Sequence, residues 1–334
     1  MKIGAFGEVM LRLTPPEYLL LEQSNQLRME FTGTGVNLLS NLSHFGQETA
    51  LLTMVPDNRL GEAALANLRR LGIATDFIGQ AGDHLGSFFA EIGYGTRPTQ
   101  VTYQNRRNSA FSLADTEDYL LADFVAQMDL IHICGISLSL TEQTVATALT
   151  LAEMAHGAGK KVCFDFNFRP SLNDEPGQKA EMKQRYEAIL PYCDLVFGSV
   201  RDLVELLHFG EAPADEAAET ALIQDFMKQY GLQWFAGTKR ERQDEPGIIG
   251  KLYTPEQEIK SVWHKLSVLD RIGAGDAYAA GILLGYGAGW DLQRTCEFAT
   301  GNAVLAHTIQ GDVPLTSRKM VEHYLQHPEV DLLR

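Results

Sequence analysis

The sequence predicts a doubly wound α/β fold, in which helices cover both faces of a mostly parallel sheet. Short apolar runs rich in β-branched and aromatic residues alternate with helix-length amphipathic stretches along the chain. The short runs are almost continuously apolar, which is typical of strands buried on both faces. The length of 334 residues is enough for one large α/β domain with a small addition.

The central strands are expected where the apolar runs are shortest and most continuous, at residues 2–7, 49–55, 129–135, 161–167, 194–199 and 233–238. The helices are expected where apolar residues recur at helical spacing, at residues 36–45, 61–71, 141–158, 177–190, 215–230, 274–285 and 291–307. Regular alternation of the two kinds of segment predicts parallel strands joined by helical crossovers.

Two stretches depart from this alternation. Residues 27–32 and 86–103 are strand-like but have no long helix between them and the neighbouring core segments. Within the second stretch, GSFFAE and TQVTY flank the turn-rich sequence GYGTRP, which predicts an antiparallel ribbon. We therefore expect a small lid that is inserted into the α/β core.

The charge balance limits the classes of partner. Lys and Arg total 28 while Asp and Glu total 43, so the formal net charge is −15. Nucleic acids and anionic membranes bind proteins that present an excess of cations, so we expect neither as a partner. No run of 18 apolar residues occurs, and the segment MKIGAFGEVM resembles a first strand more than a signal peptide.

The four cysteines are Cys134, Cys163, Cys193 and Cys296. Their spacing contains no C-x-x-C pair, and the histidines show no H-E-x-x-H, so neither a zinc site nor a redox pair is expected. The first three lie in apolar runs, where a cysteine acts as a small buried hydrophobe. This usage is consistent with a reducing cytoplasm.

The strongest local signal is the segment DRIGAGD at residues 270–276, which precedes an amphipathic helix. Glycines there let the backbone turn and expose consecutive N–H groups at the positive end of the helix. Such a nest binds an anion, most naturally a phosphate. Asp276 is then placed to take a proton from an attacking hydroxyl, although helix capping explains an aspartate there equally well.

Two other nucleotide motifs are missing. The sequence has no G-x-x-x-x-G-K-[ST], the phosphate-binding loop of Walker-type proteins. The early segment GTGVNL ends in leucine where the dinucleotide-binding pattern G-x-G-x-x-G requires glycine. The main sequence evidence for a dehydrogenase is therefore missing.

The segments TGTGVN at 32–37 and DRIGAGD at 270–276 resemble the two signatures of the PfkB/ribokinase family of sugar kinases. The segments GEVMLRLTPP, GDHLGSFFAEIG, RPTQVTYQNRRNSA, DFNFRPSL, TKRE and AHTIQGD are similar to its 2-keto-3-deoxygluconate kinase branch. The resemblance covers essentially the whole chain. It implies a ribokinase-like three-layer α/β/α sandwich with a β-sheet lid, and transfer of the ATP γ-phosphoryl group to a sugar hydroxyl with the help of Mg²⁺.

The resemblance also implies how the chain is divided and assembled. Residues 1–334 would form a single ribokinase-like domain, with a lid subdomain built from insertions near 10–32 and 86–107. Lids of this family often pair between subunits, so we expect a homodimer or a higher homo-oligomer through the lid. Exposed ribbon edges favour the same expectation, because soluble proteins usually cover them.

For the phosphoryl-transfer centre, the resemblance makes Asp276 the catalytic base and Gly273, Ala274 and Gly275 the anion hole. It places the substrate contacts at Gly33, Asn37, Phe88, Tyr103, Arg106, Arg169 and Asp312. It places the ATP contacts at Asn167, Ser199, Thr238, Lys239, Arg240, Gly273, Gly275 and Asn302. Asp202 matches a position that orders Mg²⁺-linked water, with S-x-x-D here in place of the family's N-x-x-E.

Simpler interpretations stand beside several of these assignments. Asn37 can be a helix-start residue, Arg106 a solvated lid charge and Asn302 an ordinary helix-packing residue. Arg169 follows a predicted strand, and ligands of open α/β sheets bind at that end of the strands. Its guanidinium can bind a carboxylate or phosphate with two parallel hydrogen bonds, or it can pair with Asp165.

Some positions depart from the ketodeoxygluconate pattern around the sugar. Gly35 stands where an acidic residue is usual, Phe88 where a tyrosine is usual and His84 where an arginine is usual. Both Gln104 and Asn105 separate Tyr103 from Arg106, where one residue is usual. These differences spare the phosphoryl-transfer residues, so the kinase activity is more firmly indicated than the sugar.

We therefore expect an ATP-dependent kinase that phosphorylates a primary hydroxyl of a small sugar acid. The arginines favour 2-keto-3-deoxygluconate, because a neutral sugar needs no such cations. A fructokinase, a ribokinase or another sugar kinase of the family is the main alternative. A non-catalytic sugar-binding sensor is the alternative from a different class, and the intact GAGD motif argues against it.

Overall fold

The computed structural model describes residues 1–173, 177–242 and 244–328, and its main element is a ten-stranded sheet. Its centre is parallel, and every expected central strand is present. In spatial order these strands are β11 (Trp234–Arg242), β10 (Leu195–Phe197), β9 (Lys161–Asp165), β8 (Leu130–Cys134), β1 (Lys2–Phe6) and β4 (Glu48–Val55).

Additional strands extend this sheet at both ends. Beyond β4 lies the parallel strand β5 (Ile78–Gln80), and beyond β11 lie the antiparallel strands β12 (Pro246–Tyr253), β13 (Glu258–Lys260) and β14 (His264–Lys265). They were not expected from the sequence. β5, β13 and β14 have three residues or fewer, and β12 begins with proline and contains two glycines, so none gives a continuous apolar run.

The expected helices are confirmed within a few residues at each end. They are α1 (Thr34–His44), α2 (Arg59–Arg70), α5 (Glu142–Gly157), α6 (Gln178–Ile189), α7 (Glu216–Tyr230), α8 (Ala274–Ala288) and α9 (Leu292–Ala306). The structure adds three shorter helices, α3 (Ala110–Leu113), α4 (Leu121–Gln127) and α10 (Arg318–Gln326). Helices this short carry too few turns for their periodicity to be recognised in a sequence.

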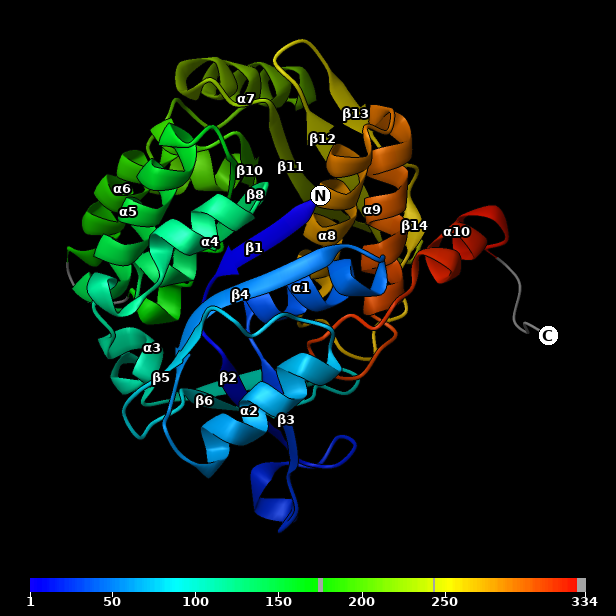
Figure 1. Cartoon of the computed structure of the whole chain (residues 1–334). Coiled ribbons are helices and arrows are strands. Elements are labelled where there is room, and N and C mark those ends of the chain that lie inside the picture. Colours follow the sequence, from blue (N-terminus) through cyan, green and yellow to red (C-terminus); the bar gives the residue numbers. More distant parts are fainter. Residues whose placement is uncertain (174–176, 243, 329–334) are drawn as a thin grey trace.

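The helices cover the two faces of the main sheet, which makes the predicted three-layer sandwich (Figure 1). Alternate residues of β1 belong to separate hydrophobic clusters. Ile3 and Ala5 lie in the cluster that includes α1, α8 and α9, whereas Phe6 lies in the cluster that includes α4, α5, α6 and α7. Strands buried on both faces in this way require the continuous apolar runs seen in the sequence.

A second, four-stranded sheet lies beyond the carboxyl ends of the parallel strands (Figure 1). Its order is β3 (Arg28–Thr32), β2 (Met10–Thr14), β6 (Ser87–Glu91) and β7 (Gln100–Gln104). The pairs β2·β3 and β6·β7 are antiparallel, as expected of ribbons, but β2 and β6 pair in parallel. The two ribbons therefore join into one mixed sheet rather than remaining separate excursions.

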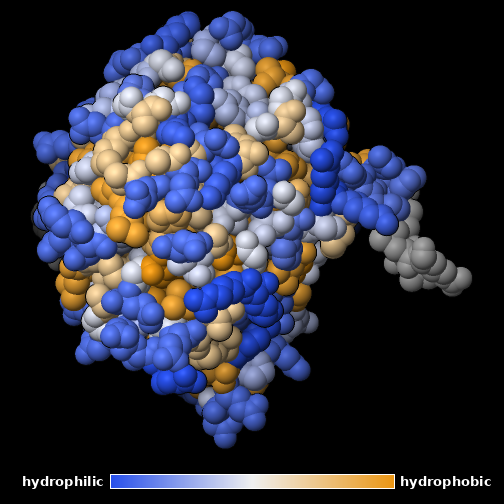
Figure 2. All heavy atoms as spheres, viewed as in Figure 1, coloured by the Kyte–Doolittle hydropathy of each residue, from blue (hydrophilic) through white to orange (hydrophobic). Residues whose placement is uncertain are grey.

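On the face drawn in Figure 2, hydrophilic residues cover most of the surface and hydrophobic residues show through in small areas. All four cysteines are buried and free, and for the first three this is the buried position that their apolar surroundings predict. Among the described residues, no helix has the length and apolar character that crossing a membrane requires.

Candidate active site

A cavity of about 490 Å³ lies between the main sheet and the four-stranded sheet. It is formed where the parallel strands end, which is the usual ligand site of an open α/β sheet. The structure brings most of the predicted substrate and phosphoryl-transfer residues to this one cavity, far apart as they are in the sequence. They are Gly33, Asn37, Phe88, Tyr103, Arg106, Asn167, Arg169, Gly273, Gly275, Asp276 and Asp312.

The loop before α8 is shaped by Gly273, which has a φ of 82°. A Cβ atom at this position would lie 1.8 Å from the carbonyl oxygen of Asp312, so only glycine fits. The first backbone bond of α8 runs from the N–H of Ala277 to the carbonyl of Gly273 at 2.9 Å. The N–H groups of the three residues between them therefore lack an acceptor within the helix and give this end of the cavity a positive potential.

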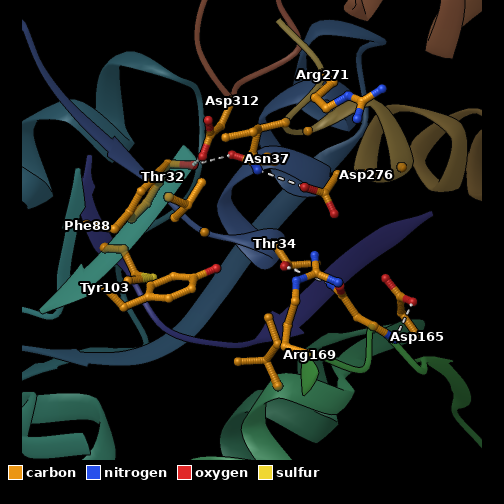
Figure 3. Close-up of a pocket in the computed structure, with 18 of the residues that line it drawn as sticks. Thr32, Thr34, Asn37, Phe88, Tyr103, Asp165, Arg169, Arg271, Asp276 and Asp312 are labelled. Atoms are coloured by element: carbon orange, nitrogen blue, oxygen red, sulfur yellow. Dashed lines mark hydrogen bonds between the residues drawn. The ribbon is translucent and has the colours of Figure 1, made fainter. Parts of the chain in front are cut away.

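The three residues of that first turn differ in their surroundings. Gly275 lines the cavity, and a Cβ atom there would meet nothing within 4 Å. Ala274 instead packs in a small cluster with Ala277 and Ala306, so only its backbone can serve a ligand. Asp276 lines the cavity with its carboxylate (Figure 3).

The Asp276 carboxylate is 9% exposed and accepts a hydrogen bond of 2.7 Å from Nδ2 of Asn37. Burial raises the pKa of Asp276 well above its usual range, and the negative charges of Asp165 and Asp312 act in the same direction. The bond from Asn37 and the charge of Arg169 oppose this shift. A carboxylate with a raised pKa is a stronger base once it is ionised.

Asn37 reaches Asp276 because of how α1 begins. Gly33 precedes the helix with a φ of 146°, and a Cβ atom there would lie 2.2 Å from the carbonyl oxygen of Glu8. Asn37 is 3% exposed and lies one turn into the helix, beyond the capping positions. Its side chain therefore does more than start the helix: it joins α1 to the first turn of α8.

The other end of the cavity is made by the four-stranded sheet. Phe88 on β6 and Tyr103 on β7 are direct neighbours across the sheet, with ring centroids 5.9 Å apart. Both line the cavity. The guanidinium carbon of Arg106 lies 5.3 Å from the centroid of the Tyr103 ring, within the range of a cation–π contact.

The two residues between Tyr103 and Arg106 do not prevent this contact. In a continuous strand, positions three apart point to opposite faces of the sheet. β7 ends at Gln104, and Asn105 adopts a left-handed conformation with φ 46° and ψ 38°. This turn brings Arg106 back to the same cavity as Tyr103. Asparagine is among the few residues that tolerate such a conformation.

Arg106 is not a solvated charge, because it is 7% exposed and its Nε donates to Oε2 of Glu8 at 2.6 Å. Burial raises the pKa of Glu8, although the charge of Arg106 opposes the rise. The second oxygen of Glu8 is buried and has no hydrogen-bond partner among the described residues. Arg106 therefore enters the cavity with part of its charge already balanced.

Arg169 differs from Arg106 in being exposed. Within the part of the chain that the structure describes, no carboxylate lies within ion-pair distance of it, Asp165 included. Figure 3 shows the guanidinium directed toward Thr34 in the middle of the cavity. Arg169 thus presents a cation at the place where the sequence predicts an anion.

The remaining predicted nucleotide residues lie outside this cavity. Ser199, Thr238 and Lys239 line a neighbouring cavity of about 170 Å³, beyond the end of β10 and beside the middle of β11. The Lys239 ammonium lies 3.5 Å from Glu216 and 3.3 Å from Glu241. Asp202 lines a third cavity, and its Oδ2 accepts from both the backbone N–H and the hydroxyl of Ser199 at 2.8 Å.

Arg240 is oriented by a histidine that the sequence did not point to. One ring nitrogen of His307 lies 2.6 Å from the carbonyl oxygen of Ala303, and the other lies 3.0 Å from Nη2 of Arg240. The first contact requires a proton on Nδ1, so Nε2 is free to accept from Arg240. Burial lowers the pKa of His307, which favours this neutral form.

The surroundings of Asn302 favour the helix-packing interpretation over a nucleotide contact. It is fully buried, and its Nδ2 donates to Asn41 at 2.6 Å and to the carbonyl of Ala277 at 2.7 Å. Its Oδ1 accepts from the Thr316 hydroxyl at 2.5 Å. These bonds join α9 to α1 and α8, so the helix-packing interpretation describes this side chain.

Several cavity residues were missed by the sequence reasoning. Thr32, Thr34, Asp165 and Arg271 line the cavity, and Arg12 lies behind it with no exposed surface. Thr32 and Thr34 belong to the TGTGVN motif and Arg271 to DRIGAGD, so their motifs were the available signal. Arg12 lies in the segment GEVMLRLTPP, but nothing there marked it as buried, because an arginine on a short strand is normally exposed.

Asp165 makes the stability of the folded protein depend on pH. Burial raises the pKa of Asp165 to about 7, with the negative charge of Asp202 adding to the effect and Arg169 opposing it. The folded protein holds this proton more tightly than the unfolded chain does, so stability falls as pH rises from about 4 to 7. Asp165→Asn should therefore raise the melting temperature at pH 8 and leave it nearly unchanged at pH 4.

Thermal unfolding of both proteins across this pH range measures the difference. Asp225→Asn on α7 is a matched control, because Asp225 has a side chain that is 69% exposed. An equal gain from Asp165→Asn at both ends of the pH range would contradict the assignment.

The chain is similar over its length to known sugar kinases. A crystal structure described as a candidate 2-keto-3-deoxygluconate kinase from Enterococcus faecalis is 61% identical, covers 100% of this chain and 99% of that one, and superposes with a TM-score of 0.97. The 2-dehydro-3-deoxygluconokinase structure from Thermotoga maritima is 28% identical, covers 98% of both chains and has a TM-score of 0.92.

Among curated proteins, the 2-dehydro-3-deoxygalactonokinase of Haloferax volcanii is 27% identical over 326 residues, which is 97% of this chain and 96% of the relative. The family profile described as "pfkB family carbohydrate kinase" matches residues 2–316. The chain therefore belongs to the pfkB family of carbohydrate kinases.

Proposed function

We propose that this kinase transfers the γ-phosphoryl group of ATP to the primary hydroxyl of 2-keto-3-deoxygluconate, giving the 6-phosphate. The observation that carries the proposal is the position of Asp276. It lies in the first turn of α8, is held by Asn37 at 2.7 Å and faces the cavity beside backbone N–H groups that have no acceptor within the helix. A base next to an anion site is the arrangement that phosphoryl transfer to an alcohol needs.

In the proposed reaction, Asp276 accepts the proton of the substrate hydroxyl as the hydroxyl oxygen attacks the γ-phosphorus. The new oxygen–phosphorus bond forms as the bond to the β-phosphate oxygen breaks, so ADP leaves with that electron pair. The N–H groups at Ala274, Gly275 and Asp276 stabilise the negative charge on the transferring group. The four-stranded sheet acts as the lid that excludes water, which limits wasteful hydrolysis of ATP.

Mg²⁺ supplies charge neutralisation on the phosphates in kinases of this kind. Within the described ranges, no group of three or more acidic, histidine or cysteine side chains could hold a metal by itself. That fits Mg²⁺, which usually keeps several waters and binds through substrate phosphates and one or two carboxylates. Asp165 and Asp202 are the nearby carboxylates that could serve it, Asp202 through water.

The charges in the cavity support a sugar acid as the substrate. Among the residues that the structure describes, no carboxylate lies within ion-pair distance of Arg169, and Arg106 stands over Tyr103 at the sugar end. A carboxylate on the sugar would complete the hydrogen bonding of either guanidinium, whereas a neutral sugar would leave that charge unused. The names of the Enterococcus, Thermotoga and Haloferax relatives all refer to ketodeoxy sugar acids.

Two further parts of the proposal concern the state of the protein in the cell. The exposed side chains of Met29 on β3, of Leu27 just before it and of Tyr94 between β6 and β7 support a homo-oligomer formed through the lid. The edge strands β3 and β7, which pair on one side only among the described residues, support it as well. The four buried free thiols support a location in the reducing cytoplasm.

The role of Asp276 can be tested with Asp276→Asn, which keeps the shape of the side chain and removes the base. We expect kcat to fall by about 100-fold or more, because a positioned base contributes roughly this factor. Binding of ATP, measured by calorimetry, should change little. Asp225→Asn serves as the exposed control, and near-normal turnover of Asp276→Asn would refute the mechanism.

Recognition of the acid can be tested at Arg106. Glu8→Gln combined with Arg106→Met removes the ion pair without leaving one buried charge alone. The KM for the sugar acid should rise about 10- to 100-fold, the effect of losing a charged hydrogen bond, while the KM for ATP stays nearly constant. Arg107→Met, at the exposed neighbouring position, is the control. Equal losses for both substrates would argue against this role.

The substrate itself is best identified with a panel in an assay that couples ADP release to a colour change. The panel contains 2-keto-3-deoxygluconate, 2-keto-3-deoxygalactonate, 5-dehydro-2-deoxygluconate, fructose and ribose. We expect the highest kcat/KM for the first, with both neutral sugars lower. A neutral sugar as the best substrate would establish the fructokinase or ribokinase alternative, and binding without turnover of every sugar would establish the sensor.

A further inference from the structure

A continuous path of hydrogen bonds joins the four-stranded sheet to Asp276. It runs from Asp270 through Arg12, Asp312, Thr32 and Asn37 to Asp276. Every member is 9% exposed or less. The part from Asp312 to Asp276 is drawn in Figure 3. Two members, Arg12 and Thr32, are on the strands β2 and β3, whereas the others belong to α1, α8 and the loops beside them.

The outer half of the path is an ion-pair cluster around Arg12. Its Nη2 donates to Oδ2 of Asp270 at 2.6 Å, its Nη1 donates to Oδ1 of Asp312 and its Nε donates to Thr14 at 2.9 Å. Asp270 also accepts from the backbone N–H groups of Ile272 and Gly311, at 3.2 Å each. Arg12 thereby holds Asp312 in a fixed place relative to the loop that leads into α8.

In the inner half of the path, the hydroxyl of Thr32 contacts both Asn37 and Asp312. Its oxygen lies 2.9 Å from Oδ1 of Asn37 and 2.8 Å from Oδ2 of Asp312. A threonine hydroxyl has one hydrogen to donate. Both contacts have the hydroxyl as donor, so its hydrogen is shared between the amide oxygen of Asn37 and the carboxylate of Asp312 as a three-centre bond.

The direction of the bond to Asn37 matters for the base. An asparagine amide has a carbonyl oxygen at one end and an NH₂ group at the other, and rotation by half a turn exchanges them. With the hydroxyl donating to Oδ1, the NH₂ group must face Asp276, where it supports the ionised carboxylate. The reverse orientation would place Oδ1 against Asp276, and an ionised carboxylate would be repelled by it.

We propose that Thr32 is a positioning residue of the kinase: its hydroxyl fixes the amide of Asn37 so that Nδ2 supports the ionised Asp276. The proposal rests on the proposed function, in which Asp276 is the base. Thr32 is the last residue of β3 and is held in place through Asp312 and Arg12. The four-stranded sheet therefore helps to position the Asp276 carboxylate, in addition to covering the cavity.

The experiment compares Thr32→Val, which removes only the hydroxyl, with Thr32→Ser, which keeps it. We expect Thr32→Val to lower kcat by about tenfold, the effect of one lost hydrogen bond, with the KM for ATP unchanged. Thr32→Ser should restore most of kcat. Thr53→Val is the matched control, because Thr53 is fully buried in β4 and its hydroxyl has no partner among the described residues.

A double-mutant cycle separates positioning from a general structural effect. In an Asn37→Ala background, Thr32→Val should cause no further loss of kcat, because it acts only through that amide. The side-chain amide signal of Asn37 in a ¹⁵N correlation spectrum should shift in Thr32→Val and not in Thr53→Val.

The outcomes keep the two hypotheses apart. Normal turnover by Asp276→Asn would refute the proposed function itself. If Asp276→Asn is inactive while Thr32→Val matches the wild type, the role of Thr32 is overturned and the function stands. Equal losses in Thr32→Val and Thr32→Ser, or additive losses with Asn37→Ala, would also overturn it, because the hydroxyl would not act through Asn37.

Discussion

Arg12 has no exposed surface, and its charge is balanced inside the protein by Asp270 and Asp312. These three residues come from β2, the loop before α8 and the loop after α9. The hydrogen bonds of this cluster connect the small sheet to both loops. Removing one partner would leave an uncompensated buried charge, at a cost of about 3–5 kcal/mol. The cavity is bounded by these same segments. Its shape, and the position of Asp276 within it, therefore depend on one buried guanidinium.

The site also shows how an acidic protein can bind anions. The net charge of −15 describes the whole chain, whereas the cavity is governed by a few groups within several ångströms. Arg169 and the first turn of α8 present positive charge there, and water is partly excluded, so each interaction is stronger than at the surface. Arg106 is already paired with Glu8 and adds directed hydrogen-bond donors more than net charge. The net charge argued against extended polyanions as partners, but it does not describe the local charge of this small, preorganised site.

Local sequence patterns were enough to predict much of the fold and part of the candidate site. The central strands and the long helices were predicted because continuous apolar runs and helical spacing are properties of neighbouring residues. The antiparallel strands β12, β13 and β14 were missed because they are defined by pairing with β11, directly or through β12, and not by their own composition. Asn302 was predicted to contact ATP by its place in a motif, and the structure uses its amide to pack three helices. A motif preserves the position of a residue but does not show where its side chain points.

The sequence by itself determined the α/β core and the glycine turn that starts α8, with Asp276 in its first turn. These follow from backbone freedom and from the periodicity of apolar residues, which act over a few residues. Only the tertiary structure decided which charges are buried together. Arg106 meets Glu8 across 98 positions, Arg12 meets Asp312 across 300, and Asn37 meets Asp276 across 239. Burial is what makes these contacts selective, and burial is a property of the folded chain that no local pattern records.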